Sequence, residues 1–230
     1  MTKRILYEDN HLIIINKMPG EIVQGDKTGD VPLSDLVKEY LKERYGKPGN
    51  VFLGVIHRID RPSSGAVIFA RTSKSLTRMN LLFRNNKVDK FYWAVVCNRP
   101  EKAQDTLEHF LVHDTTRNKS FVTGPKRTGA RQAKLTYALI AESERYFLLE
   151  VSMQTGRHHQ IRAQLAHIGC PIKGDLKYGA ARSNEDGGIH LHARGVSFEH
   201  PTREEVVKVT ASVPEDGLWA VFERMAESAG

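Results

Sequence analysis

The run HRIDRPSSG, residues 57–65, is the stretch of the chain that says most about its fold. An apolar segment at residues 52–56 precedes it and another at residues 65–70 follows it, so the pattern predicts a strand, a turn and a strand. Asp60 lies between two arginines, whose charges favour an ionised carboxylate. A carboxylate that such a turn holds in place can serve as a nucleophile or as a general base. A surface cluster of ion pairs at a turn is the alternative interpretation.

The rest of the chain alternates short apolar strands with a few helical patterns. Strands are expected at residues 5–7, 12–15, 52–56, 65–70, 90–96, 106–112, 121–122, 133–140, 146–153, 191–197 and 206–213. Helices are expected at residues 34–45, 74–84, 157–168 and 219–225. Because the strands outnumber the helices and come in hairpin-like pairs, we predict an α+β fold with a mixed, mostly antiparallel sheet and flanking helices. We expect one domain over residues 1–230.

The composition is typical of a globular protein with an anionic partner. The 230 residues are 40% hydrophobic, which is enough for a core and excludes wholesale disorder. Lys and Arg number 34 against 27 Asp and Glu, which gives a net charge of +7. Such an excess favours association with anions and does not decide the fold.

Most of this excess comes from one window, residues 115–141, which contains no Asp or Glu. Its basic residues are Arg117, Lys119, Lys126, Arg127, Arg131 and Lys134. Glycines and a proline at residues 124–129 predict a loop or hairpin there. Such a loop can follow a phosphate backbone, and a merely solvated hairpin is the alternative.

The cysteine count and the hydropathy pattern indicate a cytoplasmic protein. Cys97 and Cys170 are too few for a disulfide framework, and their spacing does not suggest a zinc site. The N-terminus does not resemble a signal peptide, and no apolar run approaches the roughly 20 residues of a membrane span.

A second candidate segment is GRHHQIRAQL, residues 156–165, which is expected to open a helix after a strand. Arg157, Gln160 and Gln164 would lie near one face of that helix. Arg157 and Arg162 carry guanidinium groups that can bind phosphate or pair with a carboxylate.

Histidine pairs raise the question of a metal site. His158 and His159 would point about 100° apart on a helix, and so cannot readily share one ion. His190 and His192 share a strand face, but neither pair has a cluster of Cys or carboxylate ligands nearby. We therefore favour structural histidines over a metal site. The sequence also lacks the phosphate-binding GxxxxGK[ST] loop, the GxGxxG dinucleotide motif and the GxSxG hydrolase elbow.

Three separated segments together resemble the pseudouridine synthases of the RluA type. They are HRIDRPSSG at residues 57–65, KFYWA at residues 90–94 and GRHHQIRAQLAHIGCPIKGDLKYG at residues 156–179. Residues 191–201 also fit the family, and the order and spacing agree from about residue 5 to residue 213. The chain departs from the family pattern at Ile59, Ser63 and Gln164, and its NKMPG run at residues 16–20 has the proline displaced by one.

The resemblance implies the pseudouridine synthase fold with a central active-site cleft. It also implies isomerisation of uridine to pseudouridine in RNA. The N1–C1′ glycosidic bond breaks, the uracil turns and C5 joins C1′, and no cofactor or metal is required. A uridine within structured RNA must be flipped out of its stack for this reaction.

The resemblance also implies roles for single residues. Asp60 is the catalytic aspartate, as a nucleophile toward the ribose or the uracil or as a base. Tyr92 would stack on the uracil, whereas without the resemblance a core strand aromatic is the favoured interpretation. Arg162 would pair with Asp60, Ile161 would pack beside it, and Arg58 would help to fill the vacated stack. We expect RNA contacts from Arg58, Arg61, Arg157, His159, Gln160, Lys126, Arg127 and Arg131.

Several alternatives remain open at this point. A non-catalytic RNA-binding or RNA-folding protein of the same fold is one, and a metal-dependent nuclease, which would need a carboxylate cluster, is another. The HRIDRP run favours tRNA over large-subunit ribosomal RNA as the target, because it resembles the tRNA-modifying branch. We expect a stand-alone catalytic domain without an S4-like domain, and a monomer by default.

Overall fold

A computed structural model describes residues 1–228 of the chain. It divides into two compact units, and strands β5 (Val88–Val96) and β10 (Leu191–Glu199) each have residues in both. Unit 1 comprises residues 1–90 and 193–212, and unit 2 comprises residues 91–192 and the described residues from 213 onward. Across the described part of the chain, no helix combines the length and the apolar character that a membrane span needs.

Unit 1 is built around two central strands that are buried on both faces. Its elements are η1 (Thr2–Arg4), β1 (Ile5–Glu8), β2 (Leu12–Lys17), α1 (Leu33–Tyr45), β3 (Gly54–Val55), β4 (Ser64–Ala70), α2 (Ser73–Arg84) and β11 (Val206–Thr210). The strand order is β1-β2-β4-β10, with β3 paired to β4 and β11 paired to β10. The β1–β2, β2–β4, β3–β4 and β10–β11 pairs are antiparallel.

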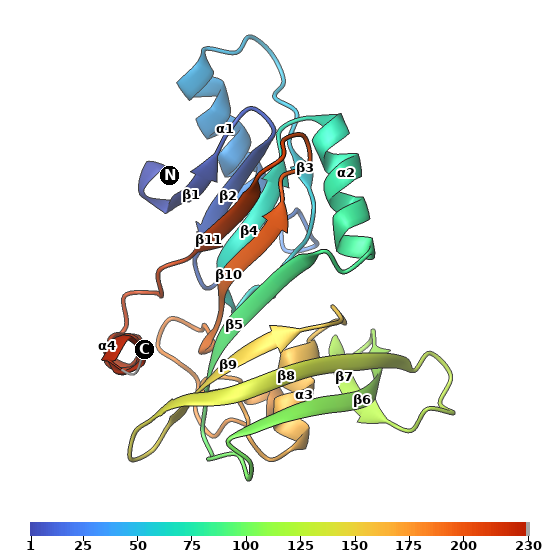
Figure 1. Cartoon of the computed structure of the whole chain (residues 1–230), viewed down its shortest axis with the longest axis vertical. Helices are drawn as coiled ribbons and strands as arrows, with labels where there is room; N and C mark the ends of the chain where they lie inside the picture. The colour runs from blue at the N-terminus through green and yellow to red at the C-terminus, as the bar shows by residue number, and fades with distance from the viewer. Residues whose placement is uncertain (229–230) are drawn as a thin grey trace. The chain divides into compact units, whose positions relative to one another are not determined.

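The alternation of side chains along β2 explains why a helix packs on each face. Leu12 and Ile14 share a core cluster with Met79 of α2. Ile13 and Ile15 share another cluster with Leu41 of α1. Because successive strand residues point to opposite faces, α1 and α2 cover opposite sides of this strand (Figure 1).

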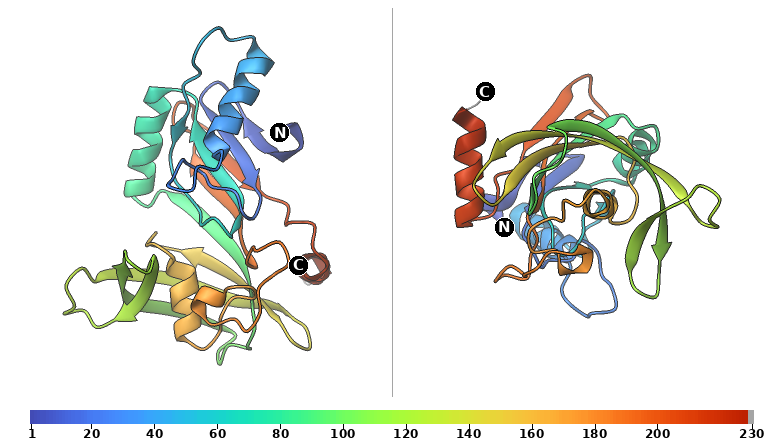
Figure 2. Two further views of the ribbon diagram at one scale, coloured as in Figure 1. Left: turned by 180° about the vertical axis from the view of Figure 1, so that it is seen from behind. Right: turned by 90° about the horizontal axis from the view of Figure 1, so that it is seen from below.

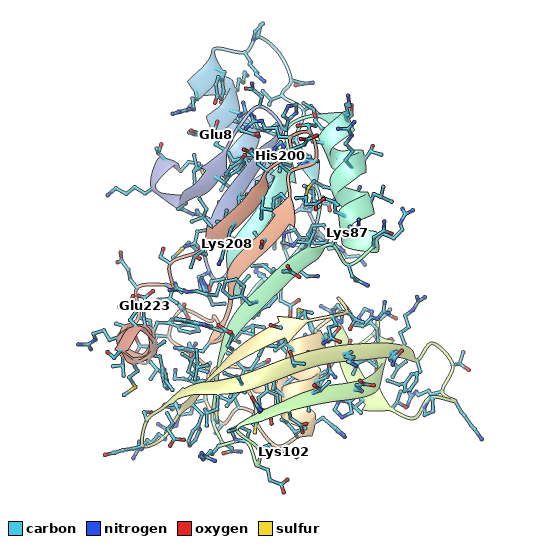
Figure 3. All side chains as sticks on the ribbon, viewed as in Figure 1. Glu8, Lys87, Lys102, His200, Lys208 and Glu223 are labelled. Atoms are coloured by element: carbon cyan, nitrogen blue, oxygen red, sulfur yellow. The ribbon has the colours of Figure 1, made fainter. Side chains whose placement is uncertain are left out.

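Side-chain hydrogen bonds fix α1 to the end of β1. Glu8, labelled in Figure 3, accepts hydrogen bonds from the hydroxyls of Tyr40 and Tyr45 at 3.0 and 2.6 Å. Arg71 lies 3.2 Å from the same carboxylate and is itself largely buried. The helix therefore has a polar anchor in addition to its apolar face.

Unit 2 is a curved antiparallel sheet packed on α3. Its remaining elements are β6 (Gln104–Asp114), β7 (Lys119–Thr123), β8 (Arg131–Glu142), β9 (Phe147–Met153), α3 (Gln160–His167), η2 (Leu176–Tyr178) and α4 (Gly217–Ser228). The strand order is β5-β9-β8-β6-β7, and each of these pairs is antiparallel. The strands bend around α3 in the right-hand view of Figure 2. Ile161 and Leu165 of α3 pack on Leu135 and Val151 of the sheet.

The predicted α+β class is confirmed, and most predicted elements lie within a few residues of the observed ones. The start of the third helix is wrong, because His159 has a φ of 51°, which the helix cannot include, and α3 begins at Gln160. The strand expected at residues 52–56 is only the two residues of β3, and β11 ends at Thr210. One catalytic domain over residues 1–230 and a central cleft stay predictions.

Candidate active site

Asp60 lies in unit 1 on the turn that leads into β4. The amide of Ser63 donates a hydrogen bond to the carbonyl of Asp60 at 3.0 Å, which closes the turn. Asp60 itself is half-buried, whereas Ser63 is buried. The predicted strand-turn-strand arrangement is thus present, although its first strand is short.

Lys17, a residue that the sequence did not single out, holds the Asp60 turn in place. Lys17 is fully buried, and its Nζ donates to the carbonyls of Met18, Arg61 and Ser63 at 2.9, 3.0 and 2.7 Å. The amide of Gly20 also donates to the carbonyl of Arg61, at 2.9 Å. The NKMPG run, whose proline is displaced from the family pattern, is therefore tied to two carbonyls of the Asp60 turn, those of Arg61 and Ser63.

Two opposing effects act on the ammonium of Lys17. Burial lowers the pKa of Lys17 to about 7, while the carboxylates of Glu21 and Asp60 raise it. The three carbonyl acceptors match the three N–H donors of the charged form. Lys17 therefore links two loops through their backbone carbonyls, and its buried ammonium is not accessible to a substrate.

The backbone around Gly65 explains why the HRIDRPSSG run ends in a glycine. Its φ of 113° is unfavourable for other residues, and a Cβ atom at this position would collide with the backbone of Ala193. The close approach of β4 to β10 behind the turn therefore requires glycine.

His57, the first residue of the same run, has a structural role. Its Nε2 accepts a hydrogen bond from the amide of Ile68 at 3.1 Å, and its ring stacks on Phe83 with centroids 5.0 Å apart. Desolvation, with a smaller effect of Lys90, lowers the pKa of His57 to about 3. The ring is therefore neutral near neutral pH and serves as an acceptor that holds β4.

Because His57 is neutral in the folded chain, we expect the protein to lose stability in mild acid. The unfolded chain takes up a proton on His57 near pH 6.5, whereas the folded chain does so only near pH 3, so the free energy of unfolding falls as the pH falls between these values. We expect His57 to account for a loss of about 2 kcal/mol between pH 7 and pH 5. Urea unfolding of the wild type and of His57→Gln, whose amide oxygen can still accept from Ile68, measures the difference. Equal pH dependence in the two proteins would contradict the assignment.

The arginines on either side of Asp60 are both exposed. Arg61 forms an exposed ion pair with Asp30 at 2.8 Å, and its carbonyl is the acceptor used by Lys17. Arg58 has its side chain in solvent, where it is available to a large ligand. Their predicted RNA contacts stay predictions.

The other predicted catalytic residues belong to unit 2. Tyr92 lies on β5, opposite Val151 of β9, and is half-buried against the core cluster that contains Ile161. Ile161 is 4% exposed and packs in that core. Because Asp60 lies in unit 1, its predicted pairing with Arg162 stays a prediction.

Arg162 is buried in unit 2 and forms a two-pronged ion pair with Asp175. Its Nε and one terminal nitrogen donate to the two carboxylate oxygens at 2.7 and 2.8 Å. The side chains are only 5% and 1% exposed. The guanidinium also lies 5.0 Å from the ring centroid of Tyr178. These contacts fix the plane of the guanidinium group.

Asp175 and Tyr178 are thus further site candidates that the sequence did not single out. The signal was available, because both lie in the KGDLKYG run at residues 173–179, which the resemblance already covered. The amides of Tyr178 and Ala180 each donate to the carbonyl of Asp175 at 3.0 Å, which orders this segment. Their side chains then meet Arg162 from a different part of the chain.

The residues around the start of α3 hold one another in place. Gln160 is buried, and its Oε1 accepts from the hydroxyl of Thr155 and the amide of Arg157 at 2.8 and 2.9 Å. Arg157 is exposed and donates from Nε to the carbonyl of Gln132 at 2.8 Å. His159 is buried and hydrogen bonds through Nδ1 to the hydroxyl of Tyr178 at 3.0 Å. We therefore propose that Gln160 and His159 position this segment, with Arg157 the exposed group among the three.

The acid-free window forms β7, the following loop and much of β8. Two of its basic groups have acidic partners from outside the window: Lys134 pairs with Glu108, and Arg117 lies 3.8 Å from Asp114. Lys126, Arg127 and Arg131 are exposed. Within residues 1–228, no group of three or more His, Cys, Asp or Glu residues is arranged to hold a metal ion.

Comparison with known proteins identifies the family to which these features belong. Residues 11–167 match the RNA pseudouridylate synthase family. An uncharacterised RNA pseudouridine synthase of Synechocystis is 31% identical over 91% of this chain and 65% of its own length. The ribosomal large subunit pseudouridine synthase C of Vibrio parahaemolyticus is 28% identical over 90% of this chain and 64% of its own length. The tRNA pseudouridine synthase C of Pasteurella multocida is 30% identical over 95% and 94%.

The chain therefore spans about two thirds of the first two relatives and nearly all of the third. The solved structure of human RNA pseudouridylate synthase domain containing 4 has the same fold, with a TM-score of 0.80 over 98% of this chain and 94% of that one, at 23% identity. Asp60, Tyr92 and Arg162 all lie within the matched residues. By fold and by sequence, this chain belongs to the RNA pseudouridylate synthase family.

Proposed function

We propose that this chain isomerises uridine to pseudouridine in structured RNA, with Asp60 as the catalytic carboxylate. The observation that carries the proposal is the rigid presentation of Asp60. Lys17 and Gly20 hold the carbonyls of its turn, and Gly65 permits the close backbone approach behind it. Family membership supplies the reaction. A fixed, half-buried carboxylate fits a group that must meet the reacting ribose or base in a defined position.

In this proposal, the residues of unit 2 bind and orient the target nucleotide. Tyr92 stacks on the uracil, and Arg162 pairs with the Asp60 carboxylate. The ion pair with Asp175 supports this role, because it holds the guanidinium in one orientation before the substrate binds. Arg58, Arg61 and Arg157 are exposed cations that suit contacts with the RNA backbone. The isomerisation exchanges one bond from C1′ for another within the substrate, so it consumes no co-reactant.

We propose tRNA as the first RNA to test. Relatives named as tRNA pseudouridine synthases and relatives named as ribosomal large subunit pseudouridine synthases have similar identities to this chain, 30% and 32% in two cases. The identities therefore do not choose between the two targets, and the HRIDRP run remains the reason to favour tRNA. We also place the reaction in the cytoplasm, in line with two free thiols.

The direct test is pseudouridine formation by the purified chain on tRNA and ribosomal RNA transcripts, with and without EDTA. Carbodiimide labelling followed by reverse transcription locates the product. Pseudouridine in the presence of EDTA would support the proposal and exclude a metal-dependent nuclease. Mapping of the same positions in RNA from cells with and without the gene identifies the natural target. Failure to form pseudouridine in either RNA would count against the proposal.

The exposed cations of the acid-free window give a second prediction. Replacing Lys126, Arg127 and Arg131 by glutamine removes the positive charges of three exposed side chains. If all three neutralise phosphates, the slope of log K against log salt falls in magnitude by about 2 to 3. The measurement is fluorescence anisotropy of labelled tRNA across a salt series. A triple variant at Lys42, Lys47 and Arg145, which are also exposed, serves as the charge-matched control. An equal slope in both variants would contradict the predicted contacts.

A further inference from the structure

The β6–β7 hairpin carries a hollow that none of the roles above uses. Its volume is about 350 Å³, and its lining residues come from both strands and the two adjacent loops. They are Val112, His113, Asp114, Arg117, Phe121 and Arg127. The size falls at the lower end of the roughly 300–1,000 Å³ of small-molecule sites, which is enough for one nucleotide but not for a folded partner.

The strand register builds an apolar floor for this hollow. Val112 of β6 lies directly opposite Phe121 of β7, so the two side chains share one face of the hairpin. The β7–β8 loop closes over this face, since a Cβ atom added to Gly129 would lie 3.9 Å from Val112. Phe121 remains half-exposed, and its ring therefore offers a surface on which a flat group can stack.

A stack of imidazole rings lies on the opposite face of the hairpin, because His113 follows Val112 on β6 and is paired with Ser120. The ring of His113 lies on that of His158, and His158 lies on His159, each with centroids 3.8 Å apart. The stack is fixed from behind, because His158 hydrogen bonds to the hydroxyl of Ser120 at 3.0 Å and His159 to that of Tyr178 at 3.0 Å. These contacts fix the back of the hairpin and so hold the face that carries Val112 and Phe121 in one position.

The walls of the hollow supply positive charge. Arg117 and Arg127 are both exposed at its rim. The ammonium of Lys119 lies 5.3 Å from the ring centroid of Phe121 and 4.8 Å from that of Tyr178. Asp114 is the one acidic group of the lining, and it already interacts with Arg117 through the backbone amide at 3.0 Å and the side chain at 3.8 Å.

From this combination we infer a nucleotide subsite: the hollow binds one unpaired nucleotide of the RNA substrate, outside the target uridine. The base stacks on Phe121 beside Val112, and the guanidinium groups of Arg117 and Arg127 contact its phosphates. Aromatic stacking is tolerant of base identity, so the subsite adds affinity and register and does not read a particular base. The inference rests on the proposed function for RNA as the ligand, and it assigns a second point of attachment in unit 2.

The test uses the full chain and a 12-nucleotide single-stranded RNA labelled with fluorescein. We expect Phe121→Leu to weaken binding by about tenfold, the size of one lost stacking contact. Phe52→Leu, at a phenylalanine that is 48% exposed in unit 1, is the matched control and should bind as the wild type does. Arg127→Gln should also weaken binding, whereas Arg145→Gln, at an exposed arginine of the β8–β9 turn, should not. Thermal melts of each variant confirm that it is folded.

A second measurement on the wild-type protein keeps the result independent of folding. RNA carrying 4-thiouridine is cross-linked by light, and the adduct is located by mass spectrometry. Adducts at residues 112–127 support the subsite, and adducts confined to other segments overturn it. Equal affinity of Phe121→Leu and the control also overturns it. Displacement of the RNA by equimolar uridine monophosphate would assign the hollow to a free nucleotide and overturn the RNA subsite.

Pseudouridine formation by the same preparations separates this inference from the proposed function. If the wild type forms pseudouridine but Phe121→Leu binds normally, the subsite is wrong and the proposed function stands. If cross-links map to the hollow but no pseudouridine forms, the proposed reaction is wrong and the RNA subsite stands.

Discussion

Asp60→Asn should lower the rate of pseudouridine formation by at least about 10³-fold while leaving the protein folded and able to bind RNA. Asparagine has the same shape as aspartate but carries no charge, so it can neither attack carbon nor accept a proton at neutral pH. The turn itself should survive, because Lys17 and the amides of Gly20 and Ser63 hold it through the backbone carbonyls of residues 60, 61 and 63. The measurement is single-turnover conversion of tRNA, with RNA affinity determined in parallel.

A matched variant separates the loss of chemistry from a general effect of removing charge. Asp35→Asn removes an exposed carboxylate of α1 that pairs with Lys38 at 2.9 Å. It should keep the wild-type rate, because a surface ion pair of this kind contributes little. If Asp60→Asn were as active as Asp35→Asn, Asp60 would not be the catalytic carboxylate. If the wild type bound RNA tightly but formed no product, a non-catalytic RNA-binding protein would become the better interpretation.

The fold could be predicted well wherever the side-chain pattern follows strand or helix geometry. The apolar run at residues 12–15 and the helical spacing at residues 34–45 both correspond to observed elements, β2 and α1. Gly46, which follows α1 directly, adopts a left-handed conformation with a φ of 56°, a common way for a helix to end at glycine. Such local signals are sufficient because each element is stabilised by contacts along its own periodic face.

The boundary of α3 could not be predicted in the same way. The helical pattern of GRHHQIRAQL extends back to Arg157, but His159 takes a positive φ that pattern and propensity do not reveal. Its ring is held between His158 and Tyr178, so contacts from η2 and from the preceding segment decide its backbone conformation. The predicted divergence of His158 and His159 is therefore wrong, because both residues precede α3 and their rings are stacked.

For the candidate site, the sequence indicated the reactive groups but not the groups that hold them. Asp60 and Arg162 were found from charge and resemblance. Lys17 was missed because its acceptors, apart from that of Met18, lie 44 and 46 residues away in the chain. A lysine at the end of an otherwise wholly buried strand is a signal that could have found it, because a buried ammonium requires several acceptors.

Asp175→Asn should lower the free energy of unfolding by about 3 kcal/mol and also slow catalysis. The carboxylate is 1% exposed and meets the guanidinium of Arg162 through two hydrogen bonds, so its loss breaks a buried ion pair. Asparagine can still accept one hydrogen bond, which places the expected cost at the lower end of values for broken buried pairs. The exposed pair of Lys102 and Asp105, with nitrogen and oxygen 3.0 Å apart, provides the control: Asp105→Asn should cost less than about 1 kcal/mol.

A double-mutant cycle shows whether this cost comes from the pair or from Asp175 alone. Arg162→Met should also destabilise the protein, because it leaves the Asp175 carboxylate buried without its partner. The double variant carries neither charge and should be less destabilised than the sum of the two single changes, by at least about 1 kcal/mol. Urea unfolding of the four proteins measures this coupling. Additive costs would mean that the two side chains act independently, and Asp175 would then not be the residue that orients Arg162.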